Sequence, residues 1–297
     1  MGSDVNVMEL TPQTLEKAFL ELNENPQQRQ SAIAELRNRI QLQSLQGCIA
    51  DEFLLRFLRA KKFNCDNALR LYINYYILRI RYPDIFNDLR PSLVEHVFRS
   101  GVVCRLPQPD SEGRALIYFK PGLWNPSEWS ANDIFRANVL VIEELLLCWP
   151  AVQVHGIIIL VDLSGFYWKH AINLMSPWFL RCAVHFLQGS SPVRVKSVHI
   201  FNSPYIFSKI YSTLMPLLKP KNQARVVMHN TSLESLHAAV PPHLLPCNSG
   251  LNGTGPPVPS SLCKRKLKER SANRLSKYLE VQYLVKLCRM LFNERIY

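Results

Sequence analysis

The fold is decided by residues 155–163, which read HGIIILVDL. Branched apolar residues fill this stretch almost without a break, as they do in a strand that is buried on both faces of a parallel sheet. Other strand-forming runs and helical patterns alternate along the chain: strands at 114–119, 195–201 and 225–229, helices at 133–149 and 178–188. Strands and helices in this order predict an α/β domain with a mostly parallel sheet.

The first 85 residues have the apolar spacing of helices. Thr11 followed by Pro12 favours the start of the first helix, because the hydroxyl can cap it and proline suits its first turn. Asp51 and Asp66 are the expected caps of two later helices, and Pro83 ends the last. These features predict a small helical domain ahead of the α/β domain.

Charge is unevenly distributed along the chain. Its 297 residues include 35 Lys and Arg against 23 Asp and Glu, a formal net charge of +12, which indicates an anionic partner such as nucleic acid, an anionic membrane or an acidic protein. Residues 256–297 hold ten basic and three acidic residues, so +7 of the +12 lies there. We therefore expect three parts: a helical domain at 1–85, an α/β domain at 90–250 and a divergent basic tail at 251–297.

Several classes of protein are excluded by what the sequence lacks. No apolar run approaches the roughly 18–20 residues that a membrane span needs, and the N-terminus has no signal-peptide pattern. The eight cysteines are dispersed, without the two-residue spacing of zinc or redox sites. We expect reduced thiols, no metal site and a cytoplasmic protein.

Catalytic and nucleic-acid motifs are also missing. There is no glycine-rich phosphate loop, no Gly-x-Ser-x-Gly elbow and no zinc-finger or RNA-binding motif. Residues 161–165, VDLSG, match a magnesium-switch pattern, but without a phosphate loop upstream we interpret them as a strand that ends in a turn. His199, within an apolar strand, is interpreted as a core residue. We expect neither an enzyme nor a nucleic-acid partner.

The segment after 199–204, HIFNSP, carries the most information about function. These residues end a strand and open a helix, with Ser203 as the expected cap and Pro204 in the first turn. The helix has a broad apolar stripe, which is either ordinary core or a mobile lid over an apolar cavity, and Pro216 favours a hinge. Cations follow at Lys219, Lys221 and Arg225. An apolar lid edged by cations suits a protein that docks on an anionic bilayer and exchanges a lipid.

Several ordered motifs resemble the CRAL-TRIO family of lipid-transfer proteins. They are DEFLLRFLRAKKF at 51–63, SSPVRVKSVHIFNSP at 190–204, VVMHN at 226–230, SLH at 235–237 and LLP at 244–246.

Within the family the sequence is most similar to the branch that holds the alpha-tocopherol transfer protein, its "-like" relative and the clavesins. Residues 106–113 and 120–127 carry the likeness to the "-like" relative, and 10–26 resemble the clavesin N-terminus.

The resemblance implies a helical bundle followed by an α/β domain with a deep apolar pocket, gated by a helix at about residues 204–218, which we call the gate segment. One hydrophobic lipid would fill the pocket, with no other cofactor. The residues at the matching positions are Tyr118, Trp124, Phe135, Asn138, Ile142, Ile157, Val161, Phe186, Leu187, Val193, Phe207, Ile210 and Leu214.

The resemblance also implies a cationic cleft for phosphoinositide headgroups, formed by Lys61, Arg194, Lys221 and Arg225, with Lys196 assisting. All of these residues are basic, as a bisphosphorylated inositol requires. Such a protein would be a monomer that visits endosomal or other phosphoinositide-bearing membranes.

Two departures from the family pattern bear on the ligand. Residues 245–251, LPCNSGL, lack the acidic residue and second glycine of the family turn, and Ile142 is apolar where the tocopherol protein has a hydroxyl. The apolar residue at Ile142 argues against tocopherol itself as the ligand. The expected function is binding and transfer of a small hydrophobic lipid of tocopherol, retinoid or phosphoinositide type. The alternative is a phosphoinositide-binding trafficking adaptor of clavesin type, without net lipid transfer.

Overall fold

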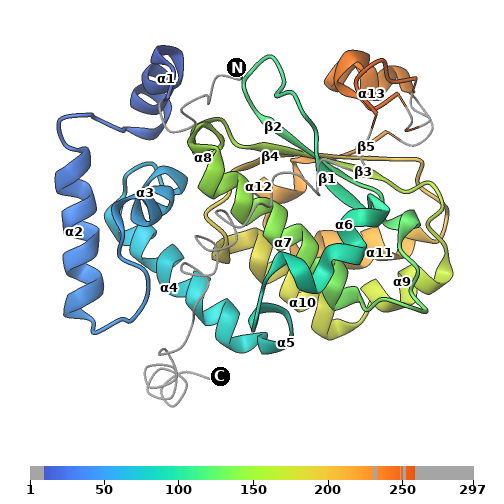
Figure 1. The fold of residues 1–297 in the computed structure, drawn as a ribbon, viewed down its shortest axis with the longest axis horizontal. Coiled ribbons are helices and arrows are strands. Elements are labelled where there is room, and N and C mark those ends of the chain that lie inside the picture. Colours follow the sequence, from blue (N-terminus) through green and yellow to red (C-terminus); the bar gives the residue numbers. More distant parts are fainter. Residues whose placement is uncertain (1–9, 230–232, 248, 250–251, 258–297) are drawn as a thin grey trace.

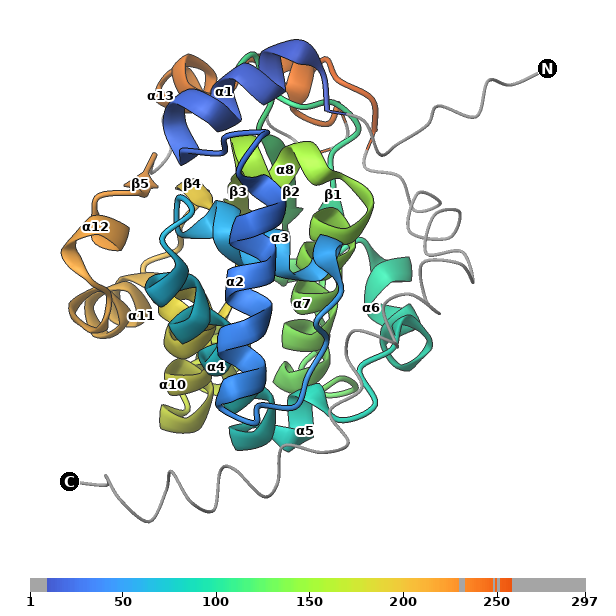
Figure 2. The same cartoon turned by 90° about the vertical axis from the view of Figure 1, so that its left-hand side faces the viewer.

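The computed structural model describes residues 10–229, 233–247, 249 and 252–257. The described chain begins with four helices, α1 (Pro12–Leu22), α2 (Arg29–Leu42), α3 (Asp51–Ala60) and α4 (Cys65–Arg81), which confirms the predicted helical start. Figure 1 shows them along one side of the molecule. In Figure 2, turned by 90°, α2 stands beside α3 and α4, and α1 lies across one end.

Local sequence explains where these helices begin. Thr11 caps α1 as expected, because its hydroxyl accepts a hydrogen bond from the backbone N–H of Thr14 at 3.2 Å. Asn64 caps α4 by accepting from a backbone N–H three residues on. The predicted caps Asp51 and Asp66 are wrong by one or two positions, since both lie inside the first turn of their helices. A carboxylate in the first turn interacts favourably with the helix dipole.

Aromatic rings hold α3 against α4. Phe53 and Phe57 of α3 meet Tyr72 and Tyr75 of α4 edge to face, with ring centroids 5.4 to 6.3 Å apart. All four side chains are buried. Each such pair contributes about 0.5–1.5 kcal/mol beyond the burial of its surface.

A five-stranded sheet follows the three short helices α5 (Pro83–Phe86), η1 (Pro91–Val94) and α6 (Glu95–Ser100). Its strands stand in sequence order: β1 (Val103–Arg105), β2 (Ala115–Phe119), β3 (Ile157–Asp162), β4 (Val195–Phe201) and β5 (Val226–Met228). β1 pairs antiparallel with β2 and the other neighbours are parallel, so the predicted α/β class is confirmed. β1 was not predicted, because three residues are too few to show a period.

Helices cross over between the parallel strands. Before β3 lie η2 (Pro121–Leu123), α7 (Ala131–Cys148) and α8 (Pro150–His155), and before β4 lie α9 (Trp168–Leu174), α10 (Pro177–His185) and a π-helical turn (Phe186–Ser190). Before β5 lie α11 (Phe207–Leu214), η4 (Met215–Leu217) and α12 (Pro220–Gln223). Two further helices, α13 (Leu233–Ala239) and η5 (Pro242–Leu244), follow the last strand.

The two faces of the sheet are covered differently. Ile157 packs in a cluster with α7 and the π-helical turn, whereas its neighbours Ile158 and Leu160 pack in a cluster with α13. Side chains alternate along a strand, so residues with the parity of Ile157 share one face. We call it the gate-side face and the other the far face. Figure 1 shows α7, α10 and α11 on one side of the sheet and α13 on the other.

The gate segment differs from its predicted form. Its helix α11 begins at Phe207, and Ser203 does not cap it; Pro204 and Tyr205 instead accept hydrogen bonds from the N–H groups of residues 207 and 208. The helix changes to the 3₁₀ turn η4 at Met215, next to Pro216, which lacks the N–H that a continuing α-helix requires. From residue 258 onward, the predicted basic tail lies outside the described residues. None of the helices in the described ranges has the length and apolar character that crossing a bilayer requires.

Candidate functional site

Most of the predicted pocket residues lie in two adjoining apolar clusters beside the gate-side face. One cluster contains Trp124, Phe135, Ile142, Ile157 and Phe186, with Val193 packed against it; the other contains Phe207 and Ile210, with Val161 packed against it. The first lies between the sheet and helices α7 and α10, and the second lies under α9 and the gate segment. Ile157 and Val161 lie on the same strand, β3, which therefore joins the two clusters.

The other predicted pocket residues are placed differently. Tyr118 belongs to the far-face cluster with α13. Asn138 uses its side-chain amide within α7, where it donates to the carbonyl of Ile134 at 2.8 Å. Leu187 is 42% exposed, and Leu214 is half-buried at the end of α11.

Tyr118 instead helps to hold a buried carboxylate. Its hydroxyl donates to Asp162 Oδ2 at 2.6 Å, and Asn202 donates to Oδ1 at 2.9 Å. Burial raises the pKa of Asp162, but the hydrogen bonds from Tyr118, Asn202 and Ser164 outweigh this effect and lower it. Asp162 ends β3, so the interpretation of VDLSG as a strand that ends in a turn is confirmed.

Asp162 also fixes the entry to the gate segment. Asn202 has φ = 53°, in the left-handed region that asparagine tolerates better than most residues. Its bond to Asp162 holds this conformation where the chain leaves β4. Further along, Phe207 meets Phe166 edge to face at 6.0 Å. The gate segment is thus anchored at its first residues and by one inward face.

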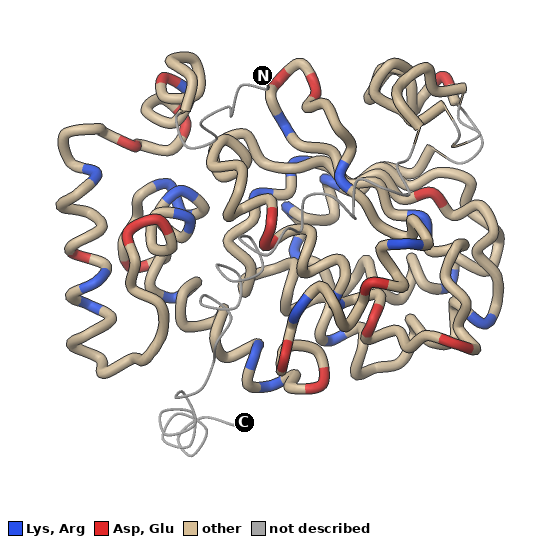
Figure 3. The backbone as a smooth tube through the Cα atoms, viewed as in Figure 1, with Lys and Arg blue, Asp and Glu red and all other residues tan. Residues whose placement is uncertain are grey.

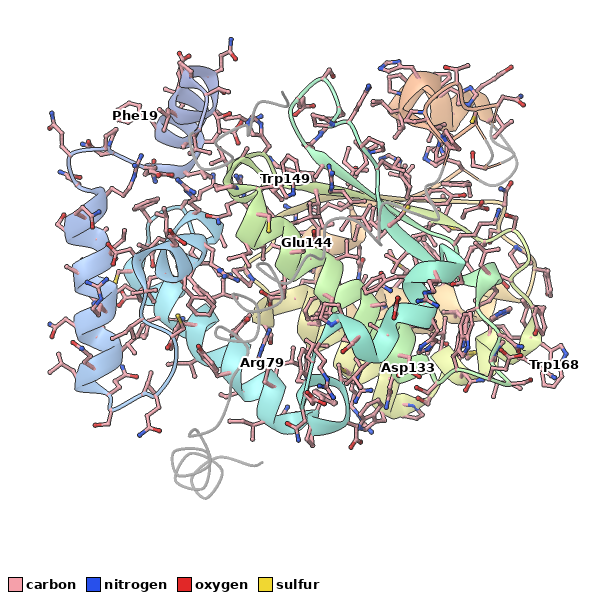
Figure 4. The ribbon with its side chains drawn as sticks, in the orientation of Figure 1. Phe19, Arg79, Asp133, Glu144, Trp149 and Trp168 are labelled. Atoms are coloured by element: carbon pink, nitrogen blue, oxygen red, sulfur yellow. The ribbon has the colours of Figure 1, made fainter. Side chains whose placement is uncertain are left out.

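Three large apolar side chains of the gate segment and the neighbouring helix α9 are exposed. Tyr205 of the gate segment is 89% exposed, and Trp168 and Ile172 of the neighbouring helix α9 are 58% and 62% exposed. Figure 4 shows Trp168 at the edge of the molecule, pointing away from it. We call these three residues the exposed apolar patch. Trp168 and Ile172 are four residues apart and therefore lie on one face of α9, and grouped exposed apolar side chains are typical of surfaces that meet a partner or a membrane.

Six basic side chains lie beside the other end of the gate segment, and we call them the cation cluster: Lys61, Arg194, Lys196, Lys219, Lys221 and Arg225. Burial first, and then the charges of Lys219 and Lys221, lower the pKa of Lys61. Burial lowers the pKa of Arg194, with a contribution from Arg225 that Glu21 opposes. Figure 3 shows basic positions close together around α12 and β4. Of the four predicted headgroup residues, Lys61 and Lys221 thus influence one another, as do Arg194 and Arg225, and Lys221 and Arg225 lie four residues apart at α12.

Two charged residues in this region were not among the predicted headgroup residues. The positive charge of Lys219 helps to lower the pKa of Lys61, although the family motifs did not include Lys219. Glu21 of α1 lies 3.7 Å from Arg194 and 3.8 Å from Lys196, so a carboxylate of the chain itself faces the cluster. In the sequence, Lys219 could be found as one of the cations that follow Pro216. Nothing in the sequence pointed to Glu21, because it lies 173 residues before Arg194.

Buried ion pairs join the N-terminal helices to the rest of the fold. Glu143 of α7 accepts from Arg56 at 2.9 Å and from Arg79 at 2.8 Å. Arg59 binds Glu24 with two hydrogen bonds of 2.8 Å and donates to Gln153 of α8 at 2.9 Å. The two arginines of the FLLRFLR motif therefore fix α3 against α7 and α8. In the sequence, this buried charge is visible only as Glu143 and Glu144, which interrupt the apolar run at 139–149.

His199 lies in the sheet interior, as interpreted. Its Nδ1 is 2.9 Å from Nε2 of His229, and its Nε2 is 2.9 Å from the hydroxyl of Ser197. Burial, followed by the charges of His229 and Arg114, lowers the pKa of His199 to about 4. Both histidines are buried, so they hold β4 to β5 in the neutral form. No group of three or more metal-ligating side chains occurs within the residues that the structure describes.

Comparisons with known proteins agree with these observations. The family model described as CRAL/TRIO domain matches residues 99–250, and that described as CRAL/TRIO, N-terminal domain matches residues 31–74. The chain is 36% identical over 246 residues to the alpha-tocopherol transfer protein-like protein of Homo sapiens, covering 82% of this chain and 71% of that one. It is 34% identical over 273 residues to Clavesin-2 of Homo sapiens, covering 91% and 82%. The crystal structure of Sfh5 aligns with a TM-score of 0.49 and 14% identity, over 71% of this chain and 75% of that one.

Proposed function

The chain belongs to the CRAL/TRIO family, and from that premise we propose that it binds one small hydrophobic lipid and carries it between membranes. The observation that carries the proposal is the gate segment, which buries Phe207 and Ile210 against the gate-side face while its outer face stays exposed beside α9. Such a segment can swing outward without unfolding the sheet beneath it. The protein would change the partition of a lipid between two phases, and no bond is made or broken.

The lipid would lie between the gate-side face and helices α7, α10 and α11. Of the predicted contacts, those in the two gate-side clusters have the position and the apolar character to enclose it. A lipid held mainly by buried area gains about 25 cal/mol per Å² of apolar surface removed from water. The proposal does not rest on Tyr118, whose hydroxyl is bound to Asp162 on the far face.

The cation cluster would recognise the phosphates of a phosphatidylinositol bisphosphate headgroup. Burial lowers the pKa values of Lys61 and Arg194, and the positive charges of their neighbours lower them further. A multivalent anion would relieve that repulsion and gain charge-assisted hydrogen bonds. The exposed apolar patch would enter the same bilayer, because aromatic residues favour the membrane interface. We therefore propose a peripheral protein of cytoplasmic membrane surfaces that carry phosphoinositides.

The test of lipid binding uses variants of the gate segment. Phe207→Asp and Leu214→Asp would place a carboxylate among the apolar contacts, whereas Ser212→Asp, at an exposed position of the same helix, is the matched control. Lipids that co-purify would be identified by mass spectrometry, and liposome-to-liposome transfer measured for tocopherol, retinol and phosphatidylinositol. Loss of loading and transfer in the first two variants alone supports the proposal. Wild-type protein that neither loads nor transfers any lipid would refute it.

The headgroup proposal has its own test. Lys221→Glu and Arg225→Glu would weaken binding to vesicles that contain phosphatidylinositol bisphosphate, and Arg99→Glu, on the surface of α6, would not. Unchanged binding in the first two variants would show that the headgroup site lies elsewhere. The adaptor alternative is separated by combining both sets. If the gate variants lose lipid but keep vesicle recruitment and cellular function, the protein senses a membrane without carrying a lipid.

A further inference from the structure

A groove of about 470 Å³ lies on the side of the gate segment that faces the N-terminal helices. Its walls come from α4, the end of α10, the π-helical turn and the end of the gate segment. The basic side chains Arg81, His185 and Lys219 line it together with Gln188 and Gly189. Its volume falls in the range of small-molecule sites.

The charge of this groove has one sign. None of the described residues that line it is Asp or Glu. Burial, and then the charges of Arg81 and Arg181, lower the pKa of His185, so positive charges already crowd this histidine. Lys219 has the same effect on Lys61 next to the groove. An anion in the groove would be attracted by all of these groups and would relieve their mutual repulsion.

The groove is built on the residues that hold the gate segment. The side chain of Gln188 donates to the carbonyl of Leu217 at 2.7 Å and accepts from the backbone N–H of Lys219 at 2.6 Å. Gln188 lies in the turn Phe186–Ser190, whose backbone leaves helical geometry at Gly189. A ligand here would therefore contact both the N-terminal helices and the end of the gate segment.

We propose that this groove binds a phosphate group, carried either by a soluble phosphate ester or by a lipid headgroup. Arg81 on α4 and Lys219 directly after the gate segment supply the charge. His185 and Gln188 line the same groove with polar side chains that also bind Tyr82 and the backbone of residues 217 and 219. The groove shares Lys219 with the cation cluster, and Arg81, His185 and Gln188 distinguish it from the headgroup residues Arg194, Lys221 and Arg225. It does not depend on lipid transfer.

Gly189 offers a direct test. A Cβ atom at this position would meet nothing within 4 Å, so there is room for a side chain that points into the groove. Gly189→Glu would place a tethered carboxylate in the groove, and Gly189→Gln is its uncharged control of the same shape. Arg81→Gln removes one cation from the groove without touching the gate segment.

Binding to the full chain would be measured with two probes: inorganic pyrophosphate by calorimetry, and phosphatidylcholine vesicles doped with phosphatidate by flotation. We expect Gly189→Glu and Arg81→Gln to weaken binding about tenfold or more, with Gly189→Gln and Arg99→Gln, on the exposed surface of α6, close to wild type. Pyrophosphate binding with this pattern identifies a soluble ester as sufficient, and vesicle binding alone identifies a lipid headgroup. The proposal is overturned if neither probe binds, or if Lys221→Gln/Arg225→Gln abolishes binding while Gly189→Glu leaves it intact. A chain that transfers no lipid but shows the expected pattern would refute the proposed function and leave this site standing.

Discussion

Replacing Glu143 by Gln should destabilise the whole fold. The carboxylate is 4% exposed and accepts from two guanidinium groups that are 2% and 1% exposed, at 2.9 and 2.8 Å. Gln keeps the shape and one acceptor oxygen but leaves Arg56 and Arg79 without the negative charge that balances them. Removing one partner from a buried ion pair costs about 3–5 kcal/mol.

The acceptor oxygen that Glu143→Gln retains offsets part of this cost, and the second deprived arginine adds to it, so we expect about 4 kcal/mol. A destabilisation of 1 kcal/mol lowers the Tm of a chain of 150–250 residues by about 2–4 °C, so the Tm should fall by roughly 8–16 °C. Calorimetry and urea unfolding monitored by circular dichroism would both measure it.

The matched control is Glu95→Gln on α6. Glu95 and Arg99 form an i,i+4 pair at 2.6 Å whose side chains are 54% and 60% exposed, so its loss should cost less than about 0.5 kcal/mol. The triple variant Arg56→Met/Arg79→Met/Glu143→Leu removes all three charges together and should recover most of the stability that Glu143→Gln loses. If Glu143→Gln lies within about 1 kcal/mol of wild type, the reasoning that these charges join the two halves of the fold is wrong.

Three further predictions concern the sheet and the gate segment. The pKa of His199 is about 4 in the folded chain against 6.5 when unperturbed, so as the pH falls the histidine is protonated in the unfolded chain before it is protonated in the folded one. Protonation therefore favours unfolding, and stability present above pH 6.5 should be lost as the pH falls toward 4. Thermal unfolding across this range should show the loss in wild type and in His243→Gln, an exposed histidine, and an unchanged slope in His199→Gln would contradict it. Asn202→Gly removes the hydrogen bond to Asp162 and should lower the free energy of unfolding by roughly 1–3 kcal/mol. Asn202→Ala should lower it by about 1 kcal/mol more, because alanine disfavours φ = 53°. Equal unfolding midpoints for the two variants would show that the backbone there is not constrained. Gln188→Ala should raise hydrogen exchange at the N–H of Lys219 about tenfold while exchange in α13 stays constant, and equal protection in both proteins would mean that Gln188 does not hold the gate segment.

Much of the fold follows from local patterns. The buried run at 155–163 predicted β3, the run at 195–201 predicted β4, and Thr11 marked the start of α1. Period and capping are properties of neighbouring residues, so a sequence displays them directly. The start of the gate helix was misplaced by three residues, because Ser203 and Pro204 suit a helix start but here form a turn held by Asn202 and Asp162.

The site was harder to predict because its parts come from distant segments. Family motifs nominated Lys61 and Arg225, yet only the folded chain brings Lys219 beside Lys61. The motifs also nominated Tyr118, whose neighbours alternate between the two faces of the sheet, so an uncertainty of one residue moves a side chain from one face to the other.

Trp168 is an intrinsic fluorescent probe of the surface around α9. It is 58% exposed, whereas the other four tryptophans are buried or half-buried. Aqueous quenchers therefore reach the indole of Trp168 most readily, and it emits from a watery environment. If α9 enters a bilayer as proposed, this indole should be the one that loses its water, with a shift of emission to shorter wavelength and protection from quenching. The unlabelled chain can thus report its own contact with a membrane.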